Sequence, residues 1–306
     1  MAGLILPSPL VFGAASIAGL YEPVSDAEAA ATLAAAWDAG IRAFDTAPHY
    51  GAGLSERRLG DFLAGRARHQ FVVSTKVGRL LVPRTETGEE SELFYGTPDD
   101  LSRVRDYSAG GVRRSLADSL DRLRLDRVDV ALIHDPDDHM EQALDEAYPA
   151  LATLREQGVV RAIGVGVNSA ELAEWFVRRC DLDCVLVAGR YTLLEQPAAV
   201  SLFPLCQERG VSVLAGGVFN SGILAGGDRY NYTAPPPEIT ARVAWLRQLC
   251  AGYDVPLPAV ALRYVLRHPA VTAAVVGART PAEIQADVDY LSVTIPDSLF
   301  RDIADP

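Results

Sequence analysis

The clearest structural signal lies in four neighbouring segments, VDVALIH (128–134), VRAIGVGV (160–167), DCVLVAG (183–189) and VSVLAGG (211–217). Each is a short, continuous run of mostly apolar and β-branched residues. Such runs are typical of strands whose two faces are both buried in a parallel sheet. Longer helical segments separate them; SAELAEWFVRR (169–179), for example, opens with Ser169, a favoured N-cap residue. The pattern predicts consecutive strand–helix units.

The same alternation extends in both directions along the chain. Further strands are predicted at 9–13, 41–45, 71–76 and 271–277. Helices are predicted at 26–40, 55–64, 108–123, 140–157, 198–209, 238–252, 258–267 and after Pro281. Eight strand–helix units in one chain favour a (β/α)8 TIM barrel. An open, doubly wound sheet also alternates β and α, but no predicted strand leads into a GxGxxG turn followed by an acidic residue about 20 positions later.

The domain organisation follows from the same pattern. A TIM barrel of roughly 250 residues with insertions accounts for a chain of 306 residues. Because no change in composition marks a linker, we expect one barrel domain over residues 1–306. The irregular stretches 78–107 and 222–237 are expected to be loop insertions over one end of the barrel.

The composition disfavours several classes of function. The net charge of −12 opposes binding to nucleic acid or to an anionic membrane, because both require a positive protein surface. No run of about 18 uninterrupted apolar residues predicts a membrane span. The amino-terminal segment also lacks the basic region of a signal peptide. We expect a cytoplasmic protein, monomeric or homodimeric, with a small-molecule substrate.

No metal site is predicted. The four cysteines, at positions 180, 184, 206 and 250, form no CxxC pair, so we interpret them as buried free thiols. The chain contains neither HxH nor HExxH, which disfavours a metallohydrolase built on a barrel.

Chemically active side chains gather at the predicted strand ends. In a β/α barrel these ends meet at one mouth, where functional groups collect. The strands end at Asp45, Lys76 and His134, and Asn168 follows the next one. Tyr50 lies just beyond Asp45 in the segment DTAPHYG. We therefore expect four ionisable groups, with the Asn168 amide beside them, to share one site.

These residue types suggest proton transfer. A free tyrosine has a pKa of about 10, too high for ready proton exchange at neutral pH. An ammonium group from Lys76 beside Tyr50 would stabilise the phenolate and lower that pKa. Asp45 would keep Lys76 charged and oriented. His134 would donate a hydrogen bond to the substrate oxygen and hold it near Tyr50.

The segments DTAPHYG (45–51), VVSTKVG (72–78), ALIHDPD (131–137) and GVGVNS (164–169) resemble, in order and spacing, the signature segments of the aldo-keto reductase superfamily. The resemblance runs from about residue 8 to 290. It implies that Asp45, Tyr50, Lys76 and His134 form the catalytic tetrad. It also implies hydride transfer to or from C4 of a nicotinamide cofactor that lies extended across the barrel mouth.

The resemblance further implies a set of cofactor-binding residues: Gly13, Asn168, Gly217, Val218, Phe219, Asn220, Gly222, Gly277, Arg279, Glu283 and Asp287. Asn168 matches the residue that holds the nicotinamide carboxamide. The backbone from Gly217 to Gly222 resembles the pyrophosphate-binding loop. VGART (276–280) and the helix after it resemble the adenosine site.

Two positions depart from the family pattern in the nicotinamide pocket. Ala188 stands where a glutamine is common, and Gly216 stands where a tyrosine usually stacks on the nicotinamide. We expect Tyr191 or Phe219 to take the place of that ring.

A third departure concerns the choice of cofactor. Glu283 stands where NADP-preferring members carry an arginine. A carboxylate there would repel a 2′-phosphate and accept a hydrogen bond from a 2′-hydroxyl. We expect NAD, with NADP as the alternative because Arg279 still offers a positive group.

Within the superfamily, AGRYTLLEQ (188–196), GGVFNSGILAGG (216–227) and DRYNY (228–232) are most similar to bacterial aldose 1-dehydrogenases of the L-fucose or D-threo-aldose type and to pyridoxal 4-dehydrogenases. This resemblance implies oxidation of the C1 hemiacetal of an aldose to a lactone, with Tyr50 as the proton acceptor. The candidate substrate-binding residues are His49, Tyr191, Tyr230 and Tyr232.

Three alternatives stay open. Two are enzymatic, a pyridoxal 4-dehydrogenase and a general aldehyde or ketone reductase. The third, of another class, is a non-catalytic cofactor-binding regulatory subunit. The intact tetrad disfavours this third alternative, because a pure binding protein does not need the pair of Lys76 and Asp45.

Overall fold

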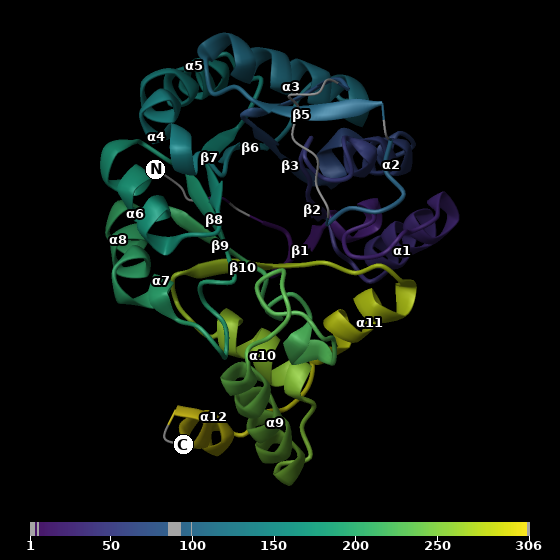
Figure 1. The fold of residues 1–306 in the computed structure, drawn as a ribbon, viewed down its shortest axis with the longest axis vertical. Coiled ribbons are helices and arrows are strands. Elements are labelled where there is room, and N and C mark those ends of the chain that lie inside the picture. Colours follow the sequence, from purple (N-terminus) through teal and green to yellow (C-terminus); the bar gives the residue numbers. More distant parts are fainter. Residues whose placement is uncertain (1–3, 5, 85–92, 99, 305–306) are drawn as a thin grey trace.

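A closed barrel of eight parallel strands forms the centre of the computed structural model, which describes residues 4, 6–84, 93–98 and 100–304 (Figure 1). The strands are β1 (Leu10–Gly13), β2 (Ala43–Asp45), β3 (Val72–Val77), β6 (Val130–His134), β7 (Ala162–Val167), β8 (Cys184–Ala188), β9 (Ser212–Gly216) and β10 (Val271–Val276). Their order is β1-β10-β9-β8-β7-β6-β3-β2, and β1 pairs with both β10 and β2 to close the sheet. The predicted barrel is confirmed, with each strand within two residues of its expected bounds.

Helices surround the barrel (Figure 1). They are α1 (Asp26–Asp38), α2 (Leu54–Leu63), α3 (Ala109–Leu123), α4 (Met140–Gln142), α5 (Tyr148–Glu156), α6 (Ala170–Arg179), α7 (Pro197–Val200), α8 (Leu202–Arg209), α9 (Pro237–Gly252), α10 (Leu257–Leu266), α11 (Pro281–Tyr290) and α12 (Asp297–Ala304). α12 packs on α9, and both lie at the lower end of Figure 1, outside the ring of helices. Ser169 caps α6 as expected, its hydroxyl accepting from the Leu172 amide at 3.1 Å.

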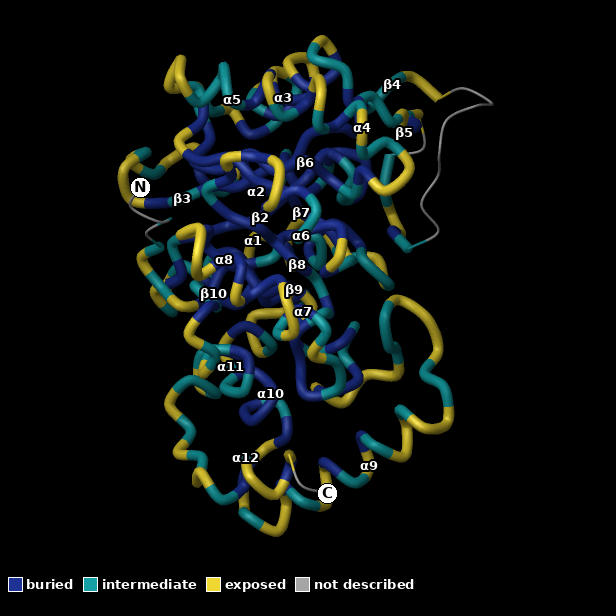
Figure 2. The backbone as a smooth tube through the Cα atoms, turned by 90° about the vertical axis from the view of Figure 1, so that its left-hand side faces the viewer, coloured by how far each residue is buried: buried dark blue, intermediate teal, exposed yellow. Residues whose placement is uncertain are grey.

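The apolar core of the barrel has two parts, one on each face of the sheet, and a third apolar cluster lies among α9, α10 and α12. One cluster, which includes Val130, Leu132, Leu186 and Leu214, comes from alternate positions of the strands. A larger cluster contains the intervening strand positions and the inner faces of the helices. Figure 2 shows the buried backbone concentrated in the strands. Burial on both faces explains why the strands are continuous apolar runs rather than alternating ones.

The structure corrects three expectations, one about a predicted loop and two about predicted helices. The stretch 78–107, predicted to be irregular, contains an antiparallel pair of strands, β4 (Arg79–Pro83) and β5 (Leu101–Arg105). Arg79, Ser102 and Arg103 leave its apolar runs short, which hid the pairing. Residues 85–92 and 99 of this insertion lie outside the described residues. The helix predicted at 140–157 is interrupted by a π-helical turn at Ala143–Ala147, and the one at 198–209 is broken at Ser201. α12 was not predicted.

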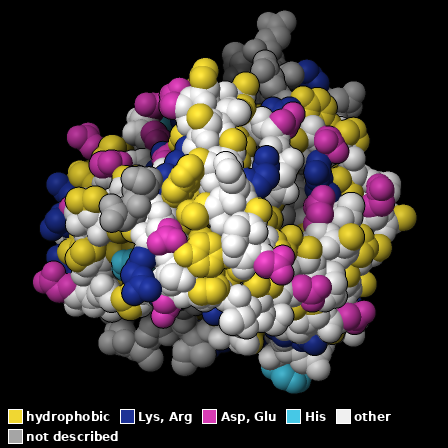
Figure 3. Space-filling view, turned by 90° about the horizontal axis from the view of Figure 1, so that it is seen from below, with side chains coloured by type: hydrophobic (Ala, Val, Ile, Leu, Met, Phe, Trp, Pro, Cys, Tyr) yellow, Lys and Arg dark blue, Asp and Glu magenta, His cyan; other side chains and the backbone are white. Residues whose placement is uncertain are grey.

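The surface seen from below in Figure 3 mixes acidic, basic and apolar side chains. On this face of the molecule they are interspersed rather than sorted into one large basic area. Within the part of the chain that the structure describes, no helix is long and apolar enough to cross a membrane.

Candidate active site

Lys76 lies at the centre of the predicted tetrad. Its Nζ atom donates to Asp45 Oδ2 at 2.7 Å, to the Thr46 carbonyl oxygen at 3.0 Å and to the Tyr50 phenol oxygen at 2.9 Å. Lys76 is 1% exposed, so its charge is compensated by these partners rather than by water. The structure therefore brings three of the four predicted catalytic residues into one hydrogen-bonded group.

The strand register produces this arrangement. β2 and β3 pair so that Asp45 lies beside Ser74, whose hydroxyl donates to Asp45 Oδ1. Lys76 follows two residues later on the same face of β3. Gly166 on β7 leaves room for the lysine, because a Cβ atom there would lie 3.3 Å from Lys76 Cε. The Asp45 carboxylate is thus fixed through both oxygens.

Of Lys76 and Tyr50, only Tyr50 has a pKa that differs from the expectation. Burial alone would lower the pKa of Lys76, but the Asp45 carboxylate and the Tyr50 oxygen raise it above its ordinary value, so Lys76 is an ammonium ion. The pKa of Tyr50 was expected to fall. Instead, removal from bulk water raises it, and Lys76 offsets only part of that effect, while Asp45 adds to it. The hydroxyl of Tyr50 is therefore protonated at neutral pH in this structure.

Two histidines complete the polar centre. The ring of His134 meets that of Tyr50 edge-on with 5.8 Å between centroids, and His49 lies 5.8 Å from His134. Burial, assisted by Arg79 and Lys76, holds the pKa of His134 well below its usual value. Burial and the Arg79 guanidinium lower the pKa of His49 to about 2. Both rings are neutral at physiological pH, so each has one N–H to donate.

Sequence reasoning missed an ion pair beside these histidines. Arg79 Nη2 lies 2.9 Å from Asp135 Oδ2, and Arg79 Nη1 lies 3.3 Å from His49 Nδ1. Asn168, the predicted carboxamide contact, donates from Nδ2 to Asp135 Oδ1 at 3.2 Å. Arg79 escaped notice because its segment was interpreted as a loop, although its position shortly after Lys76 was an available signal.

Phe94 is a second residue that the sequence did not reveal. Its ring lies against Tyr50, with 6.0 Å between centroids at 27°, and meets His49 edge-on at 5.5 Å. Phe94 forms an isolated antiparallel bridge with Leu20, and the Tyr21 amide donates to the Leu93 carbonyl oxygen at 2.8 Å. This pairing with the segment after β1 holds the Phe94 ring against the Tyr50 phenol.

The predicted pyrophosphate loop has unusual backbone geometry. Gly217, Asn220, Ser221 and Gly222 all adopt positive φ angles, of 61°, 46°, 60° and 101°. Asn220 is 1% exposed, and its Oδ1 atom has no hydrogen-bond partner within the described residues. Successive turns of this kind expose backbone N–H groups to an anion. The loop has the kind of backbone that can hold the phosphates of a dinucleotide, but its Asn220 and Gly222 amides already donate to the Gly217 and Phe219 carbonyl oxygens. Val218 and Phe219 lie in it, and Phe219 packs against the core clusters.

Gly13 and Gly277 lie side by side at the ends of β1 and β10. A Cβ atom on Gly277 would lie 2.3 Å from Ser16 Oγ and 3.5 Å from the Gly13 carbonyl oxygen. A side chain at Gly277 would therefore have to displace the Ser16 hydroxyl.

The adenosine-side residues lie at the start of α11. Glu283 Oε2 accepts from the Arg279 amide at 2.7 Å, and Arg279 Nη1 pairs with Glu22 at 2.8 Å. The hydroxyl of Thr280 accepts from the Glu283 amide at 3.2 Å and caps the helix. Asp287 is buried one turn later, and burial together with Glu283 raises its pKa to about 7.

The four predicted substrate-binding residues do not all lie in one site. Tyr191 lies in the core, where its ring stacks on Tyr264 at 5.4 Å and meets Phe203 at 4.9 Å. These contacts occupy the ring, so we leave Tyr191 out of the proposed site, both as a substrate contact and as the nicotinamide-stacking residue. His49 adjoins Tyr50 and His134, as described above.

Tyr230 and Tyr232 belong to a tight hairpin. Tyr230 and Thr233 exchange backbone hydrogen bonds across Asn231 and Tyr232, which have φ angles of 45° and 71°. The Tyr230 hydroxyl donates to Glu195. The Tyr232 hydroxyl donates to Asn168 Oδ1 at 3.2 Å, so the tip of the hairpin reaches the predicted carboxamide site.

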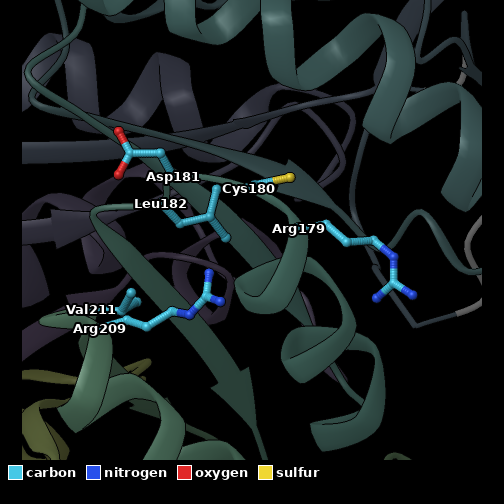
Figure 4. Close-up of a pocket in the computed structure, with 6 residues that line it drawn as sticks. All are labelled: Arg179, Cys180, Asp181, Leu182, Arg209 and Val211. Atoms are coloured by element: carbon cyan, nitrogen blue, oxygen red, sulfur yellow. The ribbon is translucent and has the colours of Figure 1, made fainter.

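An open pocket of about 390 Å³ lies elsewhere, among residues that precede β8 and β9 (Figure 4). Its lining residues are Arg179, Cys180, Asp181, Leu182, Arg209 and Val211. Because these residues lie at the amino ends of the strands, the pocket is at the opposite end of the barrel from the tetrad. Within the described residues, no cluster of three or more histidine, cysteine or acidic side chains could hold a metal ion.

Comparison with known proteins assigns the class. The model of the aldo/keto reductase family matches residues 9–305, and the chain belongs to this family of oxidoreductases. The predicted resemblance is thereby confirmed, and membership implies the use of a nicotinamide cofactor.

Among its relatives, the chain is 46% identical to D-threo-aldose 1-dehydrogenase of Pseudomonas sp, over 99% of this chain and 95% of that protein. It is 39% identical to pyridoxal 4-dehydrogenase of Microbacterium luteolum, over 95% and 91%. Among solved structures, an aldo-keto reductase of Bacillus halodurans in its holo form matches with a TM-score of 0.78 and 26% identity, covering 100% of this chain and 96% of that one.

Proposed function

We propose that this single-domain enzyme oxidises the C1 hydroxyl of a cyclic hemiacetal, foremost an aldose, to the lactone. The observation that carries the proposal is the buried contact of Lys76 with both Tyr50 and Asp45. The relatives that act on D-threo-aldose and on pyridoxal support the substrate class. Aldoses and pyridoxal share one chemical property: an internal hydroxyl adds to the aldehyde and closes a ring.

The reaction removes a hydride from C1 and a proton from the C1 hydroxyl, leaving a C=O bond. A bound nicotinamide cofactor supplies the hydride acceptor. Tyr50 in its phenolate form takes the proton, and the Lys76 ammonium stabilises that phenolate through the 2.9 Å contact. The neutral His134 donates a hydrogen bond to the same substrate oxygen.

We propose NAD as the cofactor. Arg279, the positive group in the predicted adenosine segment, is already paired with Glu22 at 2.8 Å and with Glu283 at 3.5 Å. A 2′-phosphate would have to displace these carboxylates and overcome their repulsion, whereas a 2′-hydroxyl would not. The cytoplasmic location and the monomeric or homodimeric state stay predictions.

A second candidate is pyridoxal oxidation, which the relative that is 39% identical favours. One assay separates the candidates: aldoses, pyridoxal and simple aldehydes are offered with each cofactor, and formation or loss of the reduced nicotinamide is followed by absorbance. Faster oxidation of an aldose than of pyridoxal supports the first proposal. Turnover of simple aldehydes alone would indicate a general reductase, and binding of cofactor without any turnover would indicate a regulatory subunit.

A further inference from the structure

Asp135 has a strained backbone next to the catalytic histidine. Its φ angle is 42°, in the left-handed region that few non-glycine residues adopt. The Tyr107 hydroxyl lies 2.5 Å from the His134 carbonyl oxygen and 2.8 Å from that of Asp135 and donates to them. The Asp135 amide donates to the Gly166 carbonyl oxygen at 3.0 Å. These contacts hold the carboxylate in a fixed position beside His134, with Oδ2 3.5 Å from His134 Nε2.

Arg79 and Asp135 form an ion pair that the proton transfer does not require. Their side chains are 10% and 17% exposed. Removing two charges from water is costly, and an apolar pair of similar size is often at least as stable. A left-handed non-glycine residue and a nearly buried ion pair in one place are typical of a functional site. Lys76, Asp45, Tyr50 and His134 already account for the proton transfer, so this pair needs a different explanation.

The position of the pair suggests what it binds. The C1 oxygen of a substrate must lie beside Tyr50 and His134. Substituents on the neighbouring ring carbons then come within reach of a carboxylate 3.5 Å from His134 Nε2. A hydroxyl both donates and accepts, a carboxylate only accepts, and a guanidinium only donates. Two adjacent hydroxyls therefore match an aspartate and an arginine that lie side by side.

We propose that Asp135 and Arg79 bind two adjacent ring hydroxyls of the substrate, and so select polyhydroxylated hemiacetals over simple ones. Asp135 accepts a hydrogen bond from one hydroxyl while it keeps its contacts to Arg79 and Asn168, because each carboxylate oxygen has a second lone pair. Arg79 donates to the other hydroxyl. Phe94 lines the same site with an aromatic surface that suits the C–H groups of a sugar ring.

This inference rests on the proposed oxidation of a hemiacetal, so the test compares two hemiacetals. One is an aldopyranose that the wild type oxidises; the other is 2-hydroxytetrahydropyran, which has the same ring and reacting hydroxyl but no other hydroxyls. The variant is Asp135→Asn, since asparagine tolerates the left-handed backbone. We expect kcat/KM for the aldopyranose to fall about tenfold or more, mainly through KM, as for the loss of a hydrogen bond to a charged group. For 2-hydroxytetrahydropyran we expect a change of less than about threefold.

Two further variants make the test specific. Arg79→Lys keeps the charge but loses the planar guanidinium group. It should therefore lower the ratio of kcat/KM for the aldopyranose to kcat/KM for 2-hydroxytetrahydropyran. Asp138→Asn removes a carboxylate from the same loop, 3.7 Å from Arg105 at the surface, and should leave the ratio unchanged. Thermal unfolding of each variant shows whether it is folded.

Equal losses on both substrates in Asp135→Asn would overturn the inference, because they would show that Asp135 acts only through His134. An unchanged ratio of kcat/KM values in both Asp135→Asn and Arg79→Lys would overturn it as well. If the wild type oxidises neither hemiacetal, the proposed function itself fails, and that result is visible before any variant is made.

Discussion

Lys76 Nζ lies 2.9 Å from the phenol oxygen of Tyr50 and 2.7 Å from Asp45 Oδ2, in a position that is 1% exposed. The two contacts have opposite effects on the phenol, because the ammonium lowers the pKa of Tyr50 and the carboxylate raises it. Together with burial, the balance leaves that pKa above its ordinary value. Lys76 therefore stabilises the phenolate, but Tyr50 stays protonated at neutral pH.

The pH dependence of oxidation follows from this balance. Oxidation requires the Tyr50 phenolate, whose pKa lies above its ordinary value of about 10, so the rate should rise with pH through the neutral and alkaline range. In Lys76→Met the phenol loses its positive neighbour, and the rise should move to higher pH by about one unit or more. Lys76→Arg keeps the charge and should restore part of the wild-type profile. An unchanged profile and a substantial rate in Lys76→Met would remove Lys76 from the mechanism.

Cofactor preference is tested at Glu283. The wild type should favour NAD in kcat/KM. Glu283→Arg should move the ratio toward NADP by about one to a few kcal/mol, because it removes a repulsive carboxylate and frees Arg279. Glu283→Gln is the matched control, since it keeps a side-chain oxygen for the Arg279 amide and removes only the charge. A wild type that prefers NADP, or no response to the arginine, would contradict the assignment.

The hairpin tip should influence cofactor affinity. The Tyr232 hydroxyl donates a hydrogen bond to Asn168 Oδ1, and Asn168 is the residue expected to bind the nicotinamide carboxamide. Tyr232→Phe should therefore tighten NADH binding by about two- to tenfold, the range for one net hydrogen bond. Tyr253→Phe, just after α9, whose hydroxyl donates to Asp302, serves as the control. Fluorescence titration measures both; weaker NADH binding in Tyr232→Phe would show that the hydroxyl assists the cofactor instead.

Gly78 should be indispensable for the backbone beneath the histidine. Its φ angle is 101°, and a Cβ atom there would lie 2.2 Å from the ring of Tyr107, which holds the carbonyl oxygens of His134 and Asp135. Gly78→Ala should lower the free energy of unfolding by at least about 1 to 3 kcal/mol. Gly158→Ala also has positive φ, 75°, but no atom within 4 Å of the added Cβ, and should cost less. Equal effects in chemical denaturation would show that contact with Tyr107 is unimportant.

The barrel and the grouping of the four candidate catalytic residues were predictable because both depend on local pattern. The strands are apolar runs; Asp45 and His134 end two of them and Lys76 lies one residue before the end of a third, so the topology alone brings them together. Phe94 and Asp135 were not predictable, since their places depend on the bridge between Leu20 and Phe94 and on a left-handed residue. Arg79 offered one signal, its position shortly after Lys76, but its place depends on the pairing of β4 with β5. A loop sequence does not show which way a ring turns, so the packing of Tyr191 on Tyr264 and Phe203 was not foreseen.

The central claim is that Tyr50 transfers the proton. The most direct test is single-turnover oxidation of an aldose by Tyr50→Phe, with NADH binding measured on the same preparation. We predict a loss of at least about a hundredfold in rate, the usual scale of general acid–base catalysis, with cofactor affinity almost unchanged. A rate close to that of the wild type, in a variant that still binds NADH normally, would contradict the account.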